Sequence, residues 1–195
     1  MSQSALLSAL GPVLDTLEAL GVRHYVGGSL ASSAHGIPRA SIDADLLADL
    51  GSDDIDAFVA ALEGTYYVPA ERIRDAVTRR SSFNVIHLAT MFKIDVFMAK
   101  DRAFDRQALG RARPEPLEGD ESRFVPLASA EDVVLAKLEW YRKGDEVSER
   151  QWTDVLGVLR SGAGRLDLAY LRRIADDLNV LDLLERALAE AGPGE

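Results

Sequence analysis

The chain has 195 residues, of which 47% are hydrophobic and 28% are charged, a composition typical of one globular domain or of a core with a small appendage. It contains no cysteine, which excludes disulfide bonds, thiolate zinc sites and cysteine nucleophiles. The net charge of −10 argues against a protein that coats nucleic acid. Without a signal-peptide pattern or an apolar run of about 18 residues, we expect a cytoplasmic protein with no membrane partner.

The first elements lead to a glycine turn. Residues 2–20 carry apolar side chains at helical spacing and predict an amphipathic helix. A strand is expected over residues 22–26, followed by a glycine pair that ends at Gly28 and by a short helix over residues 29–35. Free N–H groups at the start of a helix favour an anion, so Gly28 and Ser29 form a candidate phosphate site. A plain N-cap serine explains the same pattern.

The next predicted strand carries two aspartates. Asp43 and Asp45 are two residues apart, so their side chains leave the same face, with Cα atoms about 6–7 Å apart. Two carboxylates at this spacing repel each other unless a cation lies between them. The pair therefore indicates a metal site, although a solvated edge strand with an acidic face is the competing interpretation.

The middle of the chain mixes helices and strands. We expect helices over residues 52–62, capped by Ser52 or Asp53, and over residues 70–80. Residues 82–89 and 92–99 predict a hairpin. The helix over 70–80 carries four arginines that either grip the phosphates of an acceptor or form a solvated face, namely Arg72, Arg74, Arg79 and Arg80.

One charged residue of the hairpin needs a partner. Lys93, Asp95 and Phe97 share one face of the second strand, while the other face is apolar. An aspartate buried without a partner in so apolar a run is strongly destabilising. Asp95 therefore requires Lys93, a backbone donor or a metal ion.

The rest of the chain is mainly helical. A helix is expected over residues 101–110, followed by an irregular stretch with two short strands. We place a boundary near Leu127, which divides the chain into a core, residues 1–127, and a C-terminal helical subdomain, residues 128–195. The subdomain is expected to contain four amphipathic helices, one beginning after Ser129 and the others over residues 148–160, 167–178 and 180–190.

Several motifs together resemble the nucleotidyltransferase superfamily that shares its fold with DNA polymerase beta. They are Gly-Ser at residues 28–29, Arg-x-Ser-x-Asp-x-Asp at 39–45, the hairpin sequence F-N-V-I-H-L-A-T-M-F-K-I-D-V-F at 83–97, E-D-V-V-L-A-K-L-E-W-Y-R at 131–142 and R-Q-W-T-D-V at 150–155. The resemblance covers about residues 20–160. The chain is similar to the small bacterial branch, which includes abortive-infection-type toxins and uncharacterised relatives.

The resemblance implies an α+β fold, with a polymerase-beta-like core of a mixed sheet flanked by helices and a C-terminal helical bundle. It implies that Asp43, Asp45 and Asp95 are catalytic and hold one or two Mg²⁺ ions. The implied reaction transfers a nucleoside monophosphate from a nucleoside triphosphate such as ATP to a hydroxyl acceptor, which is an RNA such as tRNA, a protein or a small molecule. Further implied partners are an antitoxin or a second copy of the chain.

The resemblance also implies a set of nucleotide-binding residues. Gly28 and Ser29 would cradle the phosphates, and Lys137 would reach them from its helix. Arg39 would either neutralise phosphate charge or pair with an aspartate to fix its loop. Asp154 would lie near the active site, although an intrahelical ion pair with Arg150 explains its spacing equally well.

Three other interpretations remain open. The first is a catalytically silent module of the same fold that binds nucleotide or a partner protein, since the lysine-plus-threonine motif of the toxins is missing and Arg74 with Thr78 is only a loose substitute. The second is a purely structural interaction domain. A hydrolase nucleophile at Ser29 is disfavoured, because His87, the only histidine beyond the short helix predicted over residues 29–35, lies within a predicted strand.

Overall fold

The computed structural model describes residues 3–117 and 120–192, and the chain divides into two compact units. The first unit comprises Met1–Gly27 and Ala40–Leu127, and the second comprises Gly28–Arg39 and Ala128–Glu195. The segment Gly28–Arg39 therefore packs with the C-terminal helices, a grouping that the sequence did not indicate. The division into separate domains at Leu127 stays a prediction.

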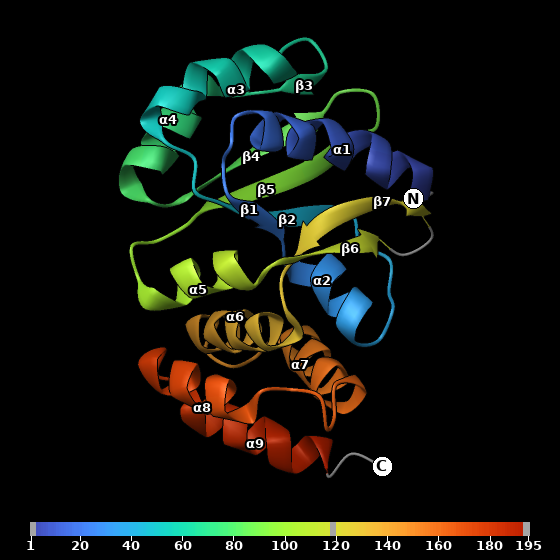
Figure 1. The fold of residues 1–195 in the computed structure, drawn as a ribbon, viewed down its shortest axis with the longest axis vertical. Helices are drawn as coiled ribbons and strands as arrows, with labels where there is room; N and C mark the ends of the chain where they lie inside the picture. The colour runs from blue at the N-terminus through green and yellow to red at the C-terminus, as the bar shows by residue number, and fades with distance from the viewer. Residues whose placement is uncertain (1–2, 118–119, 193–195) are drawn as a thin grey trace. The chain divides into compact units, whose positions relative to one another are not determined.

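A mixed sheet forms the centre of the first unit (Figure 1). Seven strands of the described residues lie in the order β3-β4-β5-β2-β1-β7-β6. Strand β2 is parallel to β5 and antiparallel to β1, and β4 pairs with β5 as the predicted antiparallel hairpin. The strands are β1 (His24–Val26), β2 (Asp43–Ala48), β3 (Tyr66–Tyr67), β4 (Ser82–His87), β5 (Phe92–Met98), β6 (Arg113–Leu117) and β7 (Asp120–Leu127).

The two faces of the sheet differ because its central strands alternate in polarity. In β5 the apolar residues Phe92, Ile94, Val96 and Met98 are buried, and the residues between them are half-buried. Strand β2 has the same alternation, with its aspartates on the half-buried face. The period of two places one side chain in the core and the next outside it, as predicted.

Helices cover the apolar face of the sheet. Helices α1 (Gln3–Ala19), α3 (Ile55–Leu62) and α4 (Ala70–Arg79) lie on one side of the sheet, and α5 (Ala103–Arg111) lies on the other (Figure 1). The buried Tyr66 hydroxyl donates a hydrogen bond of 2.7 Å to the carbonyl oxygen of Ala9, which ties β3 to α1.

The second unit is helical. Its helices are α2 (Gly28–His35), α6 (Ala130–Lys143), α7 (Glu149–Ser161), α8 (Leu168–Asp177) and α9 (Leu181–Ala191). Ser129 caps α6 as predicted, because its hydroxyl oxygen accepts a hydrogen bond from the Asp132 amide. Close packing of α2 and α7 requires a glycine after α2, since a Cβ on Gly36 would lie 2.9 Å from the backbone nitrogen of Val158.

The α+β class with a mixed sheet and C-terminal helices is confirmed. The predicted start of the helix over residues 52–62 was wrong, because Gly51 precedes a short 3-10 helix, η1 (Ser52–Asp54), and α3 begins only at Ile55. None of the helices within residues 3–117 and 120–192 is long and apolar enough to cross a membrane.

Candidate functional site

The first group of candidate residues is a row of carboxylates on the half-buried face of the sheet. Asp43 and Asp45 alternate along β2, and Asp45 lies directly opposite Asp95 in the parallel register of β2 and β5. Neighbouring strands are about 4.8 Å apart, and paired residues of parallel strands point to the same side. The sheet therefore brings the three predicted carboxylates, called here the carboxylate row, onto one face.

The ends of β1 and β2 are fixed close to this row. The Gly27 amide donates a hydrogen bond of 2.8 Å to the carbonyl oxygen of Asp45, so the glycine turn begins beside the second aspartate. The Ser41 hydroxyl lies 2.9 Å from the carbonyl oxygen of Asp43 and 3.2 Å from its Oδ1. These local bonds hold the start of β2 in one conformation.

Lys93 supplies the positive charge of the row. Its Nζ lies 2.6 Å from Oδ2 of Asp95, and the two side chains are 44% and 21% exposed. The hydrogen bond to Asp95 raises the pKa of Lys93 against the opposing effect of burial, and the charges of Asp43 and Asp45 raise it further. All three carboxylates therefore stabilise the charged form of Lys93.

The structure gives Asp95 the lysine as its partner, one of the alternatives left open by the sequence. As the side chains lie, no group of three or more His, Cys, Asp or Glu residues in the described ranges is placed to hold a metal ion. The donor set nevertheless suits Mg²⁺, which binds carboxylate oxygens. The Lys93 ammonium shows that this face attracts a cation, so the residues fit the metal if Lys93 turns away from Asp95.

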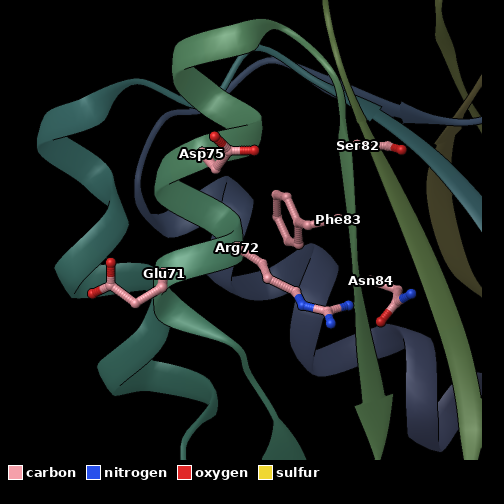
Figure 2. Close-up of a pocket in the computed structure, with 6 residues that line it drawn as sticks. All are labelled: Glu71, Arg72, Asp75, Ser82, Phe83 and Asn84. Carbon is pink, nitrogen blue, oxygen red and sulfur yellow. The ribbon is translucent and has the colours of Figure 1, made fainter.

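A groove lies between α4 and strand β4 (Figure 2). Its volume is about 470 Å³, and Asn84 on its wall lies opposite Asp95 in the register of β4 and β5. Arg72 extends from α4 toward β4 (Figure 2). Among the other predicted arginines, Arg74 and Arg79 form surface ion pairs along or near α4, as a solvated face would.

The second group of candidate residues lies in the second unit and is centred on Asp154. Arg39 donates from Nε (3.0 Å) and Nη2 (2.8 Å) to the two oxygens of Asp154. Lys137 lies 2.7 Å from Asp154 Oδ2 and 3.1 Å from the side-chain oxygen of Gln151. The side chains of Lys137 and Asp154 are only 7% and 9% exposed, so this is a buried arrangement of charges.

The charge of Asp154 is stabilised by its two cations. Burial alone would raise the pKa of Asp154, but the hydrogen bonds and charges of Arg39 and Lys137 outweigh burial and hold this pKa below its ordinary value of 3.8. The carboxylate is therefore ionised at neutral pH. Asp154 therefore bonds to Arg39 and Lys137, which are distant in sequence, where its spacing had suggested an ion pair with Arg150 within one helix. Arg39 pairs with an aspartate, which is one of the two roles that the sequence left open for it.

Ser29 joins this group through its hydroxyl oxygen, which accepts from Nη2 of Arg39 at 2.6 Å and from Nη2 of Arg150 at 3.4 Å. Gly28 begins α2 with a φ of 54°, a conformation that favours glycine. We call this group the Ser29 cluster. It comprises Ser29, Arg39, Lys137, Arg150, Gln151 and Asp154.

The structure thus brings Ser29, Arg39, Lys137 and Asp154 together. That these residues bind a nucleotide stays a prediction. Sequence reasoning missed Gln151 and the contact of Arg150 with Ser29. The spacing of four residues between Arg150 and Asp154 suggested a pair within one helix. No signal in the sequence showed that Asp154 would turn to Arg39 instead.

Comparison with known proteins identifies the fold. No family model and no curated protein matches the sequence. The solution structure of the antibiotic-resistance factor ANT(2'')-Ia matches with a TM-score of 0.50 at 17% identity, over 95% of this chain and 94% of that chain.

Two crystal structures also match the fold of this chain. ANT(2'')-Ia in complex with adenylyl-2''-tobramycin has a TM-score of 0.55 at 14% identity, over 87% of this chain and 94% of that one. An antigenic nucleotidyltransferase-like protein from Paracoccidioides brasiliensis has a TM-score of 0.50 at 14% identity, over 100% and 96%. The expected resemblance is confirmed at the level of the fold: this chain has the fold of the nucleotidyltransferases.

Proposed function

We propose that the chain transfers a nucleoside monophosphate from a nucleoside triphosphate to a hydroxyl group, with the carboxylate row holding Mg²⁺. The observation that supports this most is the register, which sets Asp45 opposite Asp95 with Asp43 on the same face. The fold of the structural neighbours agrees with this class of reaction.

The chemistry requires little covalent work from the protein. The acceptor oxygen forms a bond to the α-phosphorus, the bond from this phosphorus to the bridging oxygen breaks, and pyrophosphate leaves with the electron pair. The proton of the hydroxyl group passes to solvent. Bound Mg²⁺ supplies neutralisation of the developing charge in such transfers.

Each group of residues has a separate role in this proposal. Asp43, Asp45 and Asp95 hold the metal after Lys93 has turned toward solvent. The Ser29 cluster binds phosphate groups through its excess of positive charge. Asp154 orients Arg39 through two hydrogen bonds rather than touching the substrate.

We propose a hydroxyl of a small molecule as the acceptor. In support, the ANT(2'')-Ia complex contains an adenylylated tobramycin, and the net charge of −10 disfavours a phosphate backbone as partner. The RNA acceptor, the antitoxin, the toxin role and self-association stay predictions from the sequence.

Label transfer tests the proposal. The protein is incubated with α-labelled ATP, Mg²⁺ and a small-molecule extract, and the products are separated. The double variant Asp43→Asn with Asp45→Asn is expected to lose transfer, and the exposed Asp53→Asn serves as the matched control. Transfer that persists in the double variant would falsify the role of the carboxylate row.

A second candidate function is a catalytically silent module that binds nucleotide. It is favoured by the ion pair between Lys93 and Asp95, which satisfies the aspartate without a metal. Binding of a nucleoside triphosphate with the same affinity with and without Mg²⁺, and no transfer to any acceptor, supports this candidate. Turnover that depends on Mg²⁺ eliminates it.

A further inference from the structure

Strand β4 is covered on its outer side over only part of its length. Strand β3 pairs with Ile86 and His87 and with no earlier residue of β4. The chain then passes Pro69, which has no N–H to donate to a ladder, and enters α4. Among the residues that the structure describes, no strand pairs with Ser82–Val85 on this side. Residues 82–85 therefore form an open edge of the sheet, called here the β4 edge.

The hydrogen bonds of β4 show which of its backbone groups face this edge. The Met98 amide donates to the carbonyl oxygen of Ser81 over 2.8 Å, and bonded pairs alternate with non-bonded pairs along an antiparallel ladder. Odd-numbered residues of β4 therefore bond to β5, and even-numbered residues face the other side. The Leu88 amide follows this rule, because it donates to the carbonyl oxygen of the residue before β3. Ser82 and Asn84 thus direct their N–H and C=O groups out of the sheet, and within the described ranges these groups have no partner.

The groove between α4 and β4 runs along the β4 edge. Ser82, Phe83 and Asn84 all line it, and their side chains alternate between the two faces of the sheet. A space that borders all three must open at the edge of the strand rather than over one face. Phe83 lies between β4 and α4 and packs on Phe58, with ring centroids 6.0 Å apart (Figure 2). The volume of about 470 Å³ is within the range of roughly 300–1,000 Å³ that is usual for ligand sites.

The wall that α4 contributes presents one cation without a counter-ion. Of its three charged residues, Glu71 pairs with Arg74 at 2.7 Å. Asp75 pairs with Arg79 at 2.6 Å, so both carboxylates already have a cation. Arg72 is exposed, extends toward β4 and forms no ion pair within the described ranges (Figure 2). A ligand along the β4 edge therefore meets a positive charge that an acidic group can neutralise.

We propose that the β4 edge binds an extended segment of another protein, which adds to the sheet as a strand antiparallel to β4 and places an acidic side chain against Arg72. The backbone of this segment exchanges hydrogen bonds with Ser82 and Asn84, and its side chains occupy the groove. The inference is independent of the proposed function, because no residue of the carboxylate row lines the groove.

Two observations favour a different protein over a second copy of this chain. The β4 edge has the sequence Ser-Phe-Asn-Val, so a second copy paired through the same edge adds a strand that carries no acidic side chain for Arg72. The net charge of −10 also makes two copies repel each other. The acidic segment therefore comes from a partner.

The test selects ligands for the full-length protein from a phage library of random seven-residue peptides. The best sequence is then measured as a fluorescein-labelled peptide by anisotropy, and an acidic residue among alternating apolar residues is expected. Asn84→Pro removes the outward N–H without removing a bond to β5, so the affinity should fall tenfold or more. Asn84→Ala keeps this N–H, is the matched control and should bind as the wild type does.

Modified peptides test the backbone pairing without altering the protein. N-methylation of every second residue removes either the donors that face β4 or the donors that face away from it. One of these two peptides should lose affinity tenfold or more, and the other should bind as before. Arg72→Glu should weaken the acidic peptide tenfold or more and should prefer the same peptide with lysine at the acidic position.

Several results would overturn the inference. They are the enrichment of no peptide, equal binding by the wild type and Asn84→Pro, and equal binding of the two N-methylated peptides. An Arg72→Glu variant that does not distinguish the acidic peptide from the lysine peptide overturns the acidic ligand. A dimer in sedimentation equilibrium that Asn84→Pro dissociates and Asn84→Ala preserves would assign the β4 edge to a second copy and overturn the choice of partner.

Discussion

Replacing Lys93 by methionine tests the interpretation of the carboxylate row. The substitution keeps an unbranched side chain of similar length on β5 and removes the ammonium bound to Asp95. Asp43, Asp45 and Asp95 then share one face without their cation. We expect the free energy of unfolding to fall and the affinity for Mg²⁺ to rise.

The size of the loss follows from the strand spacing. Two unit charges about 4.8 Å apart repel by about 3 kcal/mol at an effective dielectric constant of 20, and by about 1 kcal/mol in water. The row is half-exposed and Lys93 is 44% exposed, so solvent screens most of this energy and a loss of about 1 kcal/mol or less is expected for Lys93→Met at pH 7.

Stability measured at alkaline pH gives a second test of the role of the Lys93 charge. The pKa of Lys93 is raised above its ordinary value of 10.5, so its contribution to stability is present below this pH. It is lost as the pH rises through the raised pKa. The stability difference between the wild type and Lys93→Met should therefore stay constant from pH 7 to about pH 10 and shrink above that.

Urea unfolding with and without Mg²⁺ measures both effects. A metal that binds only the folded state at 100 times its Kd adds about 2.7 kcal/mol. Lys93→Met should gain more stability from Mg²⁺ than the wild type does. The control is Lys143→Met, since Lys143 has a similar exposure of 42% and pairs with Glu139 at 2.7 Å. Equal effects of Mg²⁺ on the wild type and Lys93→Met would refute the competition between lysine and metal.

Three further predictions concern stability. Tyr66→Phe should lower the free energy of unfolding in urea by about 1 kcal/mol. Burial raises the pKa of Tyr66 to about 12, so the wild type should lose more stability than Tyr66→Phe as the pH rises from 10 to 12. Gly36→Ala should cost about 1–3 kcal/mol because its Cβ would meet backbone atoms at 2.9 Å, whereas Gly110→Ala, with open space, should gain about 0.5–1 kcal/mol. Asp154→Asn should lower the free energy of unfolding by about 3 kcal/mol, because it leaves Lys137 buried without its counter-ion. In the wild type, thermal unfolding at a series of pH values should show that the stability contributed by Asp154 is lost only as the pH falls below about 3.8, through the lowered pKa of this residue.

Alternation was sufficient to predict the central strands. The pattern of residues 92–98, with every second side chain apolar, determined which face of β5 is buried and placed Asp95 on the other. The glycine pair and Ser29 likewise predicted the transition from β1 to α2. These features are local, because strand period and helix start depend on neighbours within a few residues.

Contacts between residues far apart in sequence could not be predicted from such local patterns. Asp45 and Asp95 are 50 residues apart, and their register depends on how β2 and β5 align in the sheet. Asp154 was equally ambiguous, because its sequence neighbour Arg150 and the distant Arg39 are both suitable partners. The short 3-10 helix before α3 was missed since Ser52 and Asp53 are as suitable for a cap as for a first turn.

The ion pair between Lys93 and Asp95 does not exclude a metal. An exposed or half-exposed pair contributes about 0–1 kcal/mol, because solvent competes for both charges and two long side chains lose freedom. Lys93 is 44% exposed, so turning its ammonium into water costs little. The three carboxylates on one face, by contrast, repel each other when no cation lies beside them. A divalent ion relieves more of this repulsion than a single ammonium does, so the same field that holds Lys93 should favour its replacement.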